Sequence, residues 1–126
     1  MCDAFRMSQQ RGHVVGVFVM ASWCDTCVPS AAAWDRLLAD GGPRGLAAIG
    51  ISGDPGDTAA DVSQFAAAAK VKQLNFALDP KGDFVRLFHV ISLDTTFIFD
   101  RSGRVVFQQA TAPPYPILRD QLEKLL

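Results

Sequence analysis

The stretch Met20–Ser30, MASWCDTCVPS, decides how this sequence is interpreted. Two cysteines, Cys24 and Cys27, are separated by two residues and follow directly after an apolar run and Trp23. A pair with this spacing can be a redox-active dithiol, half of a metal site or a structural bridge. The structure expected on either side of the pair distinguishes these alternatives.

The segment before the pair, residues 13–21 (HVVGVFVMA), is rich in β-branched residues and almost wholly apolar. This pattern predicts a strand buried on both faces, at the centre of a largely parallel sheet. The segment after it, residues 27–40, has apolar residues at helical spacing and stops at the GGP of residues 41–43. The pair is therefore expected at a strand-to-helix junction.

That position suits thiol chemistry. The unpaired N–H groups at a helix N-terminus favour an anion, so they lower the pKa of a nearby thiol. One helical turn brings Cys27 back toward Cys24, close enough to form a disulfide. We expect Cys24, as the more exposed thiol, to attack a substrate disulfide and Cys27 to resolve the mixed disulfide, with Trp23 as an apolar rim. An inert buried pair and a metal site remain alternatives.

The rest of the chain alternates strands and helices, which predicts the α/β class. Thr58 is a plausible helix N-cap, and Pro116 suits the start of the last helix. The expected strands are 45–52, 75–79, 95–100 and 104–109, and the expected helices are 59–71, a short one within 80–90, and one within 113–126. Phe84, Leu87 and Phe88 in the short helix are expected to cover the edge of the sheet.

Composition points to one globular domain spanning residues 1–126. The chain has a mass of 13.6 kDa, 49% apolar residues and 20% charged residues. Its net charge of −1 gives no reason to expect binding to nucleic acid, and its longest apolar run, residues 14–21, is too short to span a bilayer. No signal-peptide pattern opens the sequence, so the compartment is left open.

The remaining cysteine and the histidines give little support to a structural metal. Cys2 lies in a polar N-terminal segment and is interpreted as a free thiol. A structural zinc site would need a second Cys or His pair at close spacing, whereas His13 and His89 stand alone. Three cysteines are also too few for a disulfide-stapled scaffold.

Two motifs, FVMASWCDTC (residues 18–27) and TTFIFDRSG (residues 95–103), resemble the TlpA/ResA-like branch of thioredoxin-fold proteins. The likeness runs from His13 to the C-terminus. It implies a thioredoxin-like fold with a mixed four- to five-stranded sheet flanked by helices, and an extra helix and short strand after the second core strand. It also implies thiol–disulfide exchange with cysteine-containing proteins and an upstream redox partner. No cofactor is expected because the cysteines carry the electrons. We expect a monomer, and the branch slightly favours an extracytoplasmic location.

One position departs from that branch. The family places a cis-proline just before TTF, and here the residue is Asp94. Because a non-proline cis bond costs about 3–4 kcal/mol, the Leu93–Asp94 bond is expected to be trans. Asp94 is either a solvent-facing turn residue or a carboxylate within reach of the sulfurs, where it would raise the thiol pKa or act as a base for Cys27. Asp25 pushes the thiol pKa in the same direction, and Thr26 replaces a common, more rigid proline.

Two other classes share this fold. Peroxiredoxins need a threonine three residues and a proline seven residues before the reactive cysteine, and Ala21 and Val17 stand there instead.

Sco-like copper-handling proteins use two cysteines in CxxxC spacing and a histidine at the position of Asp94. A carboxylate is a poor ligand for Cu(I). Metal that co-purifies would favour this class, whereas a reversible two-electron thiol titration would favour an oxidoreductase.

Overall fold

The computed structural model describes residues 12–126, so the interpretation of Cys2 as a free thiol lies outside the described residues. The order of helices and strands is the one predicted. The elements are β1 (Val14–Met20), α1 (Cys27–Gly41), the 3₁₀ turn η2 (Gly42–Arg44), β2 (Leu46–Ser52), α2 (Ala59–Ala69), β3 (Asn75–Leu78), α3 (Asp83–Leu87), β4 (Thr95–Phe99), β5 (Val105–Gln109) and α4 (Tyr115–Glu123).

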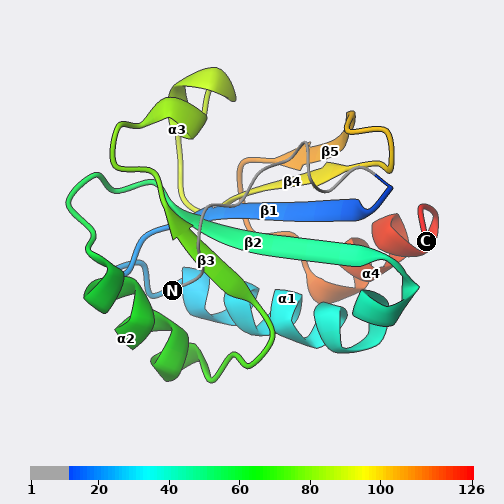
Figure 1. Cartoon of the computed structure of the whole chain (residues 1–126), viewed down its shortest axis with the longest axis horizontal. Coiled ribbons are helices and arrows are strands. Elements are labelled where there is room, and N and C mark those ends of the chain that lie inside the picture. The colour runs from blue at the N-terminus through cyan, green and yellow to red at the C-terminus, as the bar shows by residue number, and fades with distance from the viewer. Residues whose placement is uncertain (1–11) are drawn as a thin grey trace.

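The strands form one five-stranded mixed sheet in the order β3-β2-β1-β4-β5 (Figure 1). β1 lies at its centre, and all seven of its residues are buried, as its apolar sequence predicts. β1 pairs with β2 in parallel and with β4 in antiparallel orientation. β4 and β5 form the predicted antiparallel hairpin. The extra helix and strand after the second core strand are α2 and the edge strand β3.

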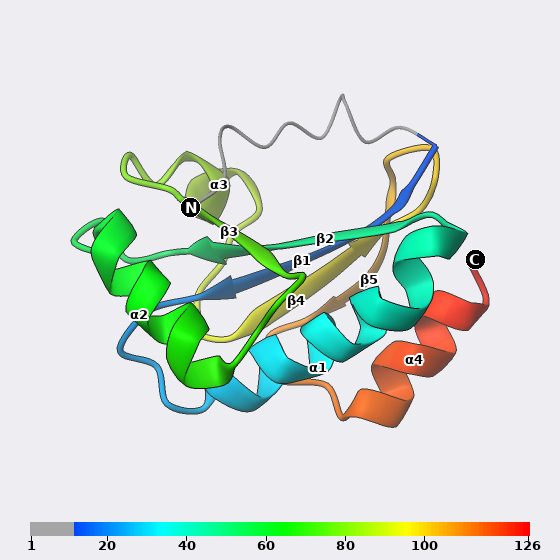
Figure 2. The same cartoon turned by 60° about the horizontal axis from the view of Figure 1, so that its bottom comes forward.

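Helices cover the two faces of the sheet unequally (Figure 2). α1, α2 and α4 lie on one face, where alternate residues of β1 such as Phe18 and Met20 join a core cluster with Trp34. α3 lies on the other face, where Phe84 and Phe88 pack against Phe97.

The short helix α3 corrects one detail of the sequence interpretation. Phe84, Leu87 and Phe88 were expected to cover a sheet edge together. Phe84 and Phe88 instead pack on the sheet face, and Leu87 is 72% exposed. α3 ends at Leu87, and Phe88 follows it in a non-helical conformation. The spacing that would place residues 84, 87 and 88 on one face of a regular helix therefore does not apply to all three.

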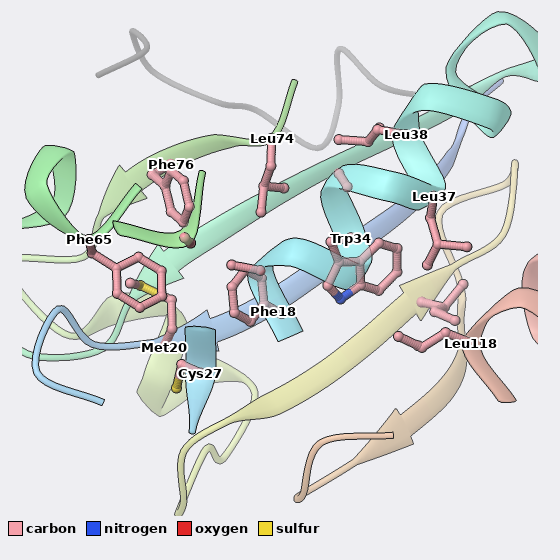
Figure 3. Packing of buried hydrophobic residues seen from close by; sticks show 14 of the residues in the cluster. Phe18, Met20, Cys27, Trp34, Leu37, Leu38, Phe65, Leu74, Phe76 and Leu118 are labelled. Atoms are coloured by element: carbon pink, nitrogen blue, oxygen red, sulfur yellow. The ribbon is translucent and has the colours of Figure 1, made fainter. Parts of the chain in front are cut away.

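The centre of β1 and the middle of α1 approach each other closely (Figure 3). Trp34 is 1% exposed, and its ring occupies the space that a side chain at Gly16 would need. Leu37 and Leu38 are buried beside it, as expected for the core face of this helix. The contact between Gly16 and Trp34 therefore fixes how α1 sits on the central strand.

α2 and the segment after it are anchored by side-chain acceptors. Thr58 is the N-cap of α2, as predicted, and forms a complete capping box with Asp61. Beyond the helix, the backbone N–H groups of residues 72–74 all donate to Asp35 on α1, at 2.6–3.0 Å. These bonds bind α2 and the start of β3 to the helix that begins at Cys27.

A dithiol site at the strand-to-helix turn

Cys24 and Cys27 lie in the turn that joins β1 to α1. The backbone N–H of Cys24 donates to the carbonyl of Ala21 at 3.0 Å, and that of Cys27 donates to Cys24 at 3.1 Å. The two cysteines form a disulfide, with a Cα–Cα distance of 5.3 Å, which is ordinary for such a bond. Cys27 is the first residue of α1, so Cys24 lies in the turn just before the helix.

The two sulfurs differ in their surroundings. Cys24 is 8% exposed and Cys27 is 0% exposed, which is the expected order. Both cysteines belong to the core cluster, and Cys27 lies near Met20 and Phe65 at one end of it (Figure 3). An incoming sulfur can therefore reach Cys24 more readily than Cys27.

The N-terminus of α1 has no side-chain cap. Thr26 occupies the N-cap position without bonding the helix, and no acidic residue lies in the first turn. The hydroxyl of Thr26 lies 3.4 Å from the sulfur of Cys24 instead. The first N–H groups of α1 bond backbone carbonyls, since Cys27 donates to Cys24 and Val28 donates to Asp25. The dipole of the helix is therefore what is left to stabilise a thiolate that precedes it. Asp25 and Thr26 are both exposed.

Trp23, the residue before Cys24, lies at the surface. Its side chain is 65% exposed, but its indole N–H donates to Asp54 at 2.7 Å. Trp23, Asp54 and Leu93 are among the residues that line a largely apolar groove of about 350 Å³. Leu93, a predicted site residue, thus lines the same groove as Trp23, the residue before Cys24.

Asp57, a carboxylate that the sequence interpretation missed, contacts the segment just before Cys24. Asp57 accepts hydrogen bonds from the backbone N–H of Ser22 at 2.8 Å, from the Ser22 hydroxyl at 2.6 Å and from the Ser52 hydroxyl at 2.6 Å. Burial alone would raise the pKa of Asp57, but the hydrogen bonds from Ser22 and Ser52 outweigh it and hold the pKa below its usual value. The sequence signal was the acidic turn GDPGD, residues 53–57, directly after a buried strand.

Asp94 contradicts one sequence-based expectation and excludes one of the two alternatives left open for this residue. The Leu93–Asp94 peptide bond is cis, not trans, and Asp94 is 3% exposed, so it is not a solvent-facing turn residue. The expectation weighed only the isolated peptide bond. In the fold, hydrogen bonds fix the loop on either side of that bond, because Thr95 donates to the carbonyl of Ser92 at 2.6 Å and Ser92 donates to that of Ala110 at 2.7 Å.

The backbone places Asp94 beside the start of the motif. Thr95 pairs with Val19 in the sheet, so the residue before Thr95 lies next to the end of β1. One carboxyl oxygen of Asp94, Oδ2, is buried and has no hydrogen-bond partner. Among the predicted site residues, the cysteines, Trp23, Leu93 and Asp94 therefore gather at one end of the sheet.

Within residues 12–126, no three His, Cys, Asp or Glu side chains are grouped so that they could hold a metal ion. His13 and His89 are both exposed. In the sequence, neither of them lies near another cysteine or histidine. Nothing in this part of the chain favours the copper-handling alternative over thiol chemistry.

No helix within the described residues combines the length and the apolar character needed to cross a membrane.

Comparison with solved structures finds close likenesses in fold. A thiol:disulfide interchange protein DsbE from Chlorobium tepidum matches with a TM-score of 0.84 and 28% identity, over 94% of this chain and 84% of that one. A thioredoxin-like protein from Aeropyrum pernix matches with a TM-score of 0.79 and 26% identity, over 95% of this chain and 82% of that one. The exposed lipoprotein thioredoxin Etrx1 from Streptococcus pneumoniae matches with a TM-score of 0.83 and 22% identity, over 96% of this chain and 91% of that one. At this identity the match shows a shared fold alone.

A search of curated proteins found no match. The model of the AhpC/TSA family matches residues 2–108, most of the chain. This family match, the thioredoxin-like sheet and the disulfide at the strand-to-helix turn agree with one another. The chain therefore belongs to the AhpC/TSA family, and it is a thioredoxin-fold thiol–disulfide oxidoreductase of the TlpA/ResA-like kind.

Proposed function

We propose that the Cys24–Cys27 pair exchanges disulfides with cysteine-containing protein substrates. The observation that carries this proposal is the asymmetry of the pair, because Cys24 is partly accessible and Cys27 is wholly buried in the core. An accessible thiolate can attack a partner, and a buried thiol next to it can only complete the exchange.

The reaction requires two displacement steps. In the reduced protein the Cys24 thiolate attacks one sulfur of the substrate disulfide, a bond forms between them, and the other substrate sulfur leaves as a thiolate. Cys27, after losing its proton, then attacks the Cys24 sulfur and releases the second substrate thiol. The substrate gains two electrons and the protein forms the disulfide seen here.

The groove lined by Trp23, the residue before Cys24, supports a protein substrate because it offers an apolar surface next to the reactive residue. It is open, largely apolar and lined by Trp23 and Leu93, so it can receive a side chain that flanks the target cysteine. Because each cycle leaves the pair oxidised, an upstream redox partner must restore the dithiol. We propose that the protein works as a monomer, since one chain supplies both sulfurs and the groove.

Asp25 and Asp94 are proposed to modulate the pair. A carboxylate near a thiol raises the thiol pKa by repelling the thiolate. Asp25 lies between the cysteines and Asp94 lies beside the end of β1, so both oppose the stabilisation that the helix N-terminus provides. The balance of these effects would set how readily Cys24 ionises.

The proposal is tested by replacing Cys27 with serine, in a background where Cys2 is also serine. Without the resolving thiol, Cys24 should form mixed disulfides that persist, and these should be recovered from a lysate by non-reducing electrophoresis. The control Cys24→Ser should trap no partner, because its remaining thiol is buried. Failure of Cys27→Ser to trap any protein, while Cys24 still reacts with an alkylating reagent, would contradict a protein-disulfide substrate.

A further inference from the structure

The two residues before Cys24 lie against the turn that follows β2. β1 and β2 are parallel and in register, with Met20 opposite Ser52, so their carboxyl ends meet at the same edge of the sheet. The backbone N–H of Gly53 donates to Met20 at 2.8 Å, just beyond the last paired residues. This continuation brings the turn of residues 53–57 beside residues 21–23.

Asp57 in this turn binds Ser22 twice. Its Oδ2 accepts the Ser22 backbone N–H and the hydroxyl of Ser52, and its Oδ1 accepts the Ser22 hydroxyl. Ser52 is 0% exposed and ends a core strand, so the carboxylate is fixed to the sheet on one side and to the chain before Cys24 on the other. Hydrogen bonds to an ionised carboxylate are about twice as strong as those between neutral groups.

We infer that Asp57 is a positioning residue that holds Cys24 at bonding distance from Cys27. This inference rests on the proposed function. Cys27 is held by α1, which packs on the core through Trp34. Cys24 precedes the helix, and Asp57 ties Ser22, two residues before Cys24, to the sheet. The effective concentration of one thiol at the other depends on both being held, and a looser Cys24 would form its disulfide less favourably.

Asp57 also carries a charge, and its two contributions can be separated. Asp57→Ala removes both the charge and the hydrogen bonds to Ser22. Asp57→Asn removes the charge but keeps a carbonyl oxygen that can accept from the Ser22 backbone and Ser52, while its NH₂ group can donate to the Ser22 hydroxyl. The difference between the two variants reports the positioning role.

The chain offers a matched control at the far end of the sheet. Asp100, in the turn between β4 and β5, likewise accepts hydrogen bonds from a serine hydroxyl and two backbone N–H groups, those of Ser102 and Arg104. Asp100→Ala therefore removes a similar set of bonds from a turn that is remote from the cysteines.

The experiment equilibrates each protein with glutathione buffers and measures the equilibrium constant for forming the Cys24–Cys27 disulfide, with Cys2 replaced by serine. We expect Asp57→Ala to lower this constant by roughly three- to tenfold, the larger change corresponding to about 30 mV in potential. Asp57→Asn should recover most of that loss, and Asp100→Ala should match the wild type.

An Asp57→Ala constant equal to that of Asp100→Ala would overturn the inference. An Asp57→Asn constant as low as that of Asp57→Ala would overturn it too, because charge rather than position would then matter. If Asp57→Ala does not fold, Ser52→Ala removes one of the three bonds and should lower the constant in the same direction, and no change would count against the inference. The glutathione equilibrium involves no protein substrate, so its outcome is independent of the trapping experiment.

Discussion

At the scale of single residues, Asp94 is the most unusual group near the cysteines. It stands where the related branch has proline, it is buried, and its Oδ2 has no hydrogen-bond partner. A buried polar atom without a partner costs stability, so such groups in a native fold call for an explanation. Because Asp94 lies beside the end of β1, we test whether its carboxylate affects the ionisation of the thiols.

We predict that Asp94→Asn lowers the pKa of Cys24. The variant removes a carboxylate that would repel the thiolate, so the thiolate becomes more stable. A more stable thiolate favours the reduced form, and the pair becomes more oxidising. The measurement is the pH dependence of Cys24 alkylation in the reduced protein, with Cys2 replaced by serine.

Asp100→Asn provides the control for that titration, since it removes the same charge from the turn between β4 and β5. A titration curve for Asp94→Asn that overlays the wild-type curve would exclude an electrostatic role for Asp94.

Single-residue features could be predicted from the sequence where the reason was local. The order of exposure of Cys24 and Cys27 follows from their places before and at the start of a helix. The role of Asp57 could not be predicted, because its bonds to Ser22 join segments 35 residues apart and depend on the register of β1 with β2. The burial of Asp94 likewise depends on what packs around its loop.

At the scale of elements, every predicted helix and strand is present because each has a strong periodic pattern or a clear capping signal. The buried strand β1 and the amphipathic helix α1 are the clearest cases. α3 was placed correctly but its contacts were not, since five residues carry too little periodicity to show which face they cover. The capping of α2 was the most specific local signal.

We predict that Thr58→Ala lowers the free energy of unfolding by about 1 kcal/mol, the usual cost of losing an N-cap. Thr58 accepts the Asp61 backbone N–H at 3.1 Å, and Asp61 accepts that of Thr58 at 2.9 Å, so the variant leaves the first turn of α2 with an unmet donor. Urea unfolding measures the change. Ser63→Ala, at an exposed position within the same helix, is the control and should not destabilise the protein. Equal midpoints for the two variants would contradict the prediction.

At the scale of the whole molecule, several carboxylates make stability depend on pH. Burial would raise the pKa of Asp35, but the backbone N–H groups of residues 72–74 outweigh it, and the pKa is lowered. Hydrogen bonds from Ser22 and Ser52 lower that of Asp57 in the same way. The pKa of Glu123 is lowered by its hydrogen bonds with Arg44.

A carboxyl group whose pKa is lower in the folded protein contributes stability above its unfolded pKa of about 4 and loses it as the pH falls through the folded value. We therefore predict that the free energy of unfolding changes little through these groups between pH 7 and 5 and falls steadily below about pH 4. Urea unfolding at a series of pH values measures this. The fall should be shallower in Asp35→Asn, and a wild-type protein that gains stability on acidification would contradict the prediction.

The contact between Gly16 and Trp34 has a consequence for how such proteins diverge. Cys27 and Trp34 lie two turns apart on the same helix, and both face the same core cluster. Because the indole ring fills the space above Gly16, the axial position of the helix, and with it the buried sulfur, is set by an apolar contact deep in the protein. Related chains with an identical WCDTC motif can therefore differ in redox behaviour through substitutions that never touch a cysteine, and comparison of motifs alone would overlook that source of variation.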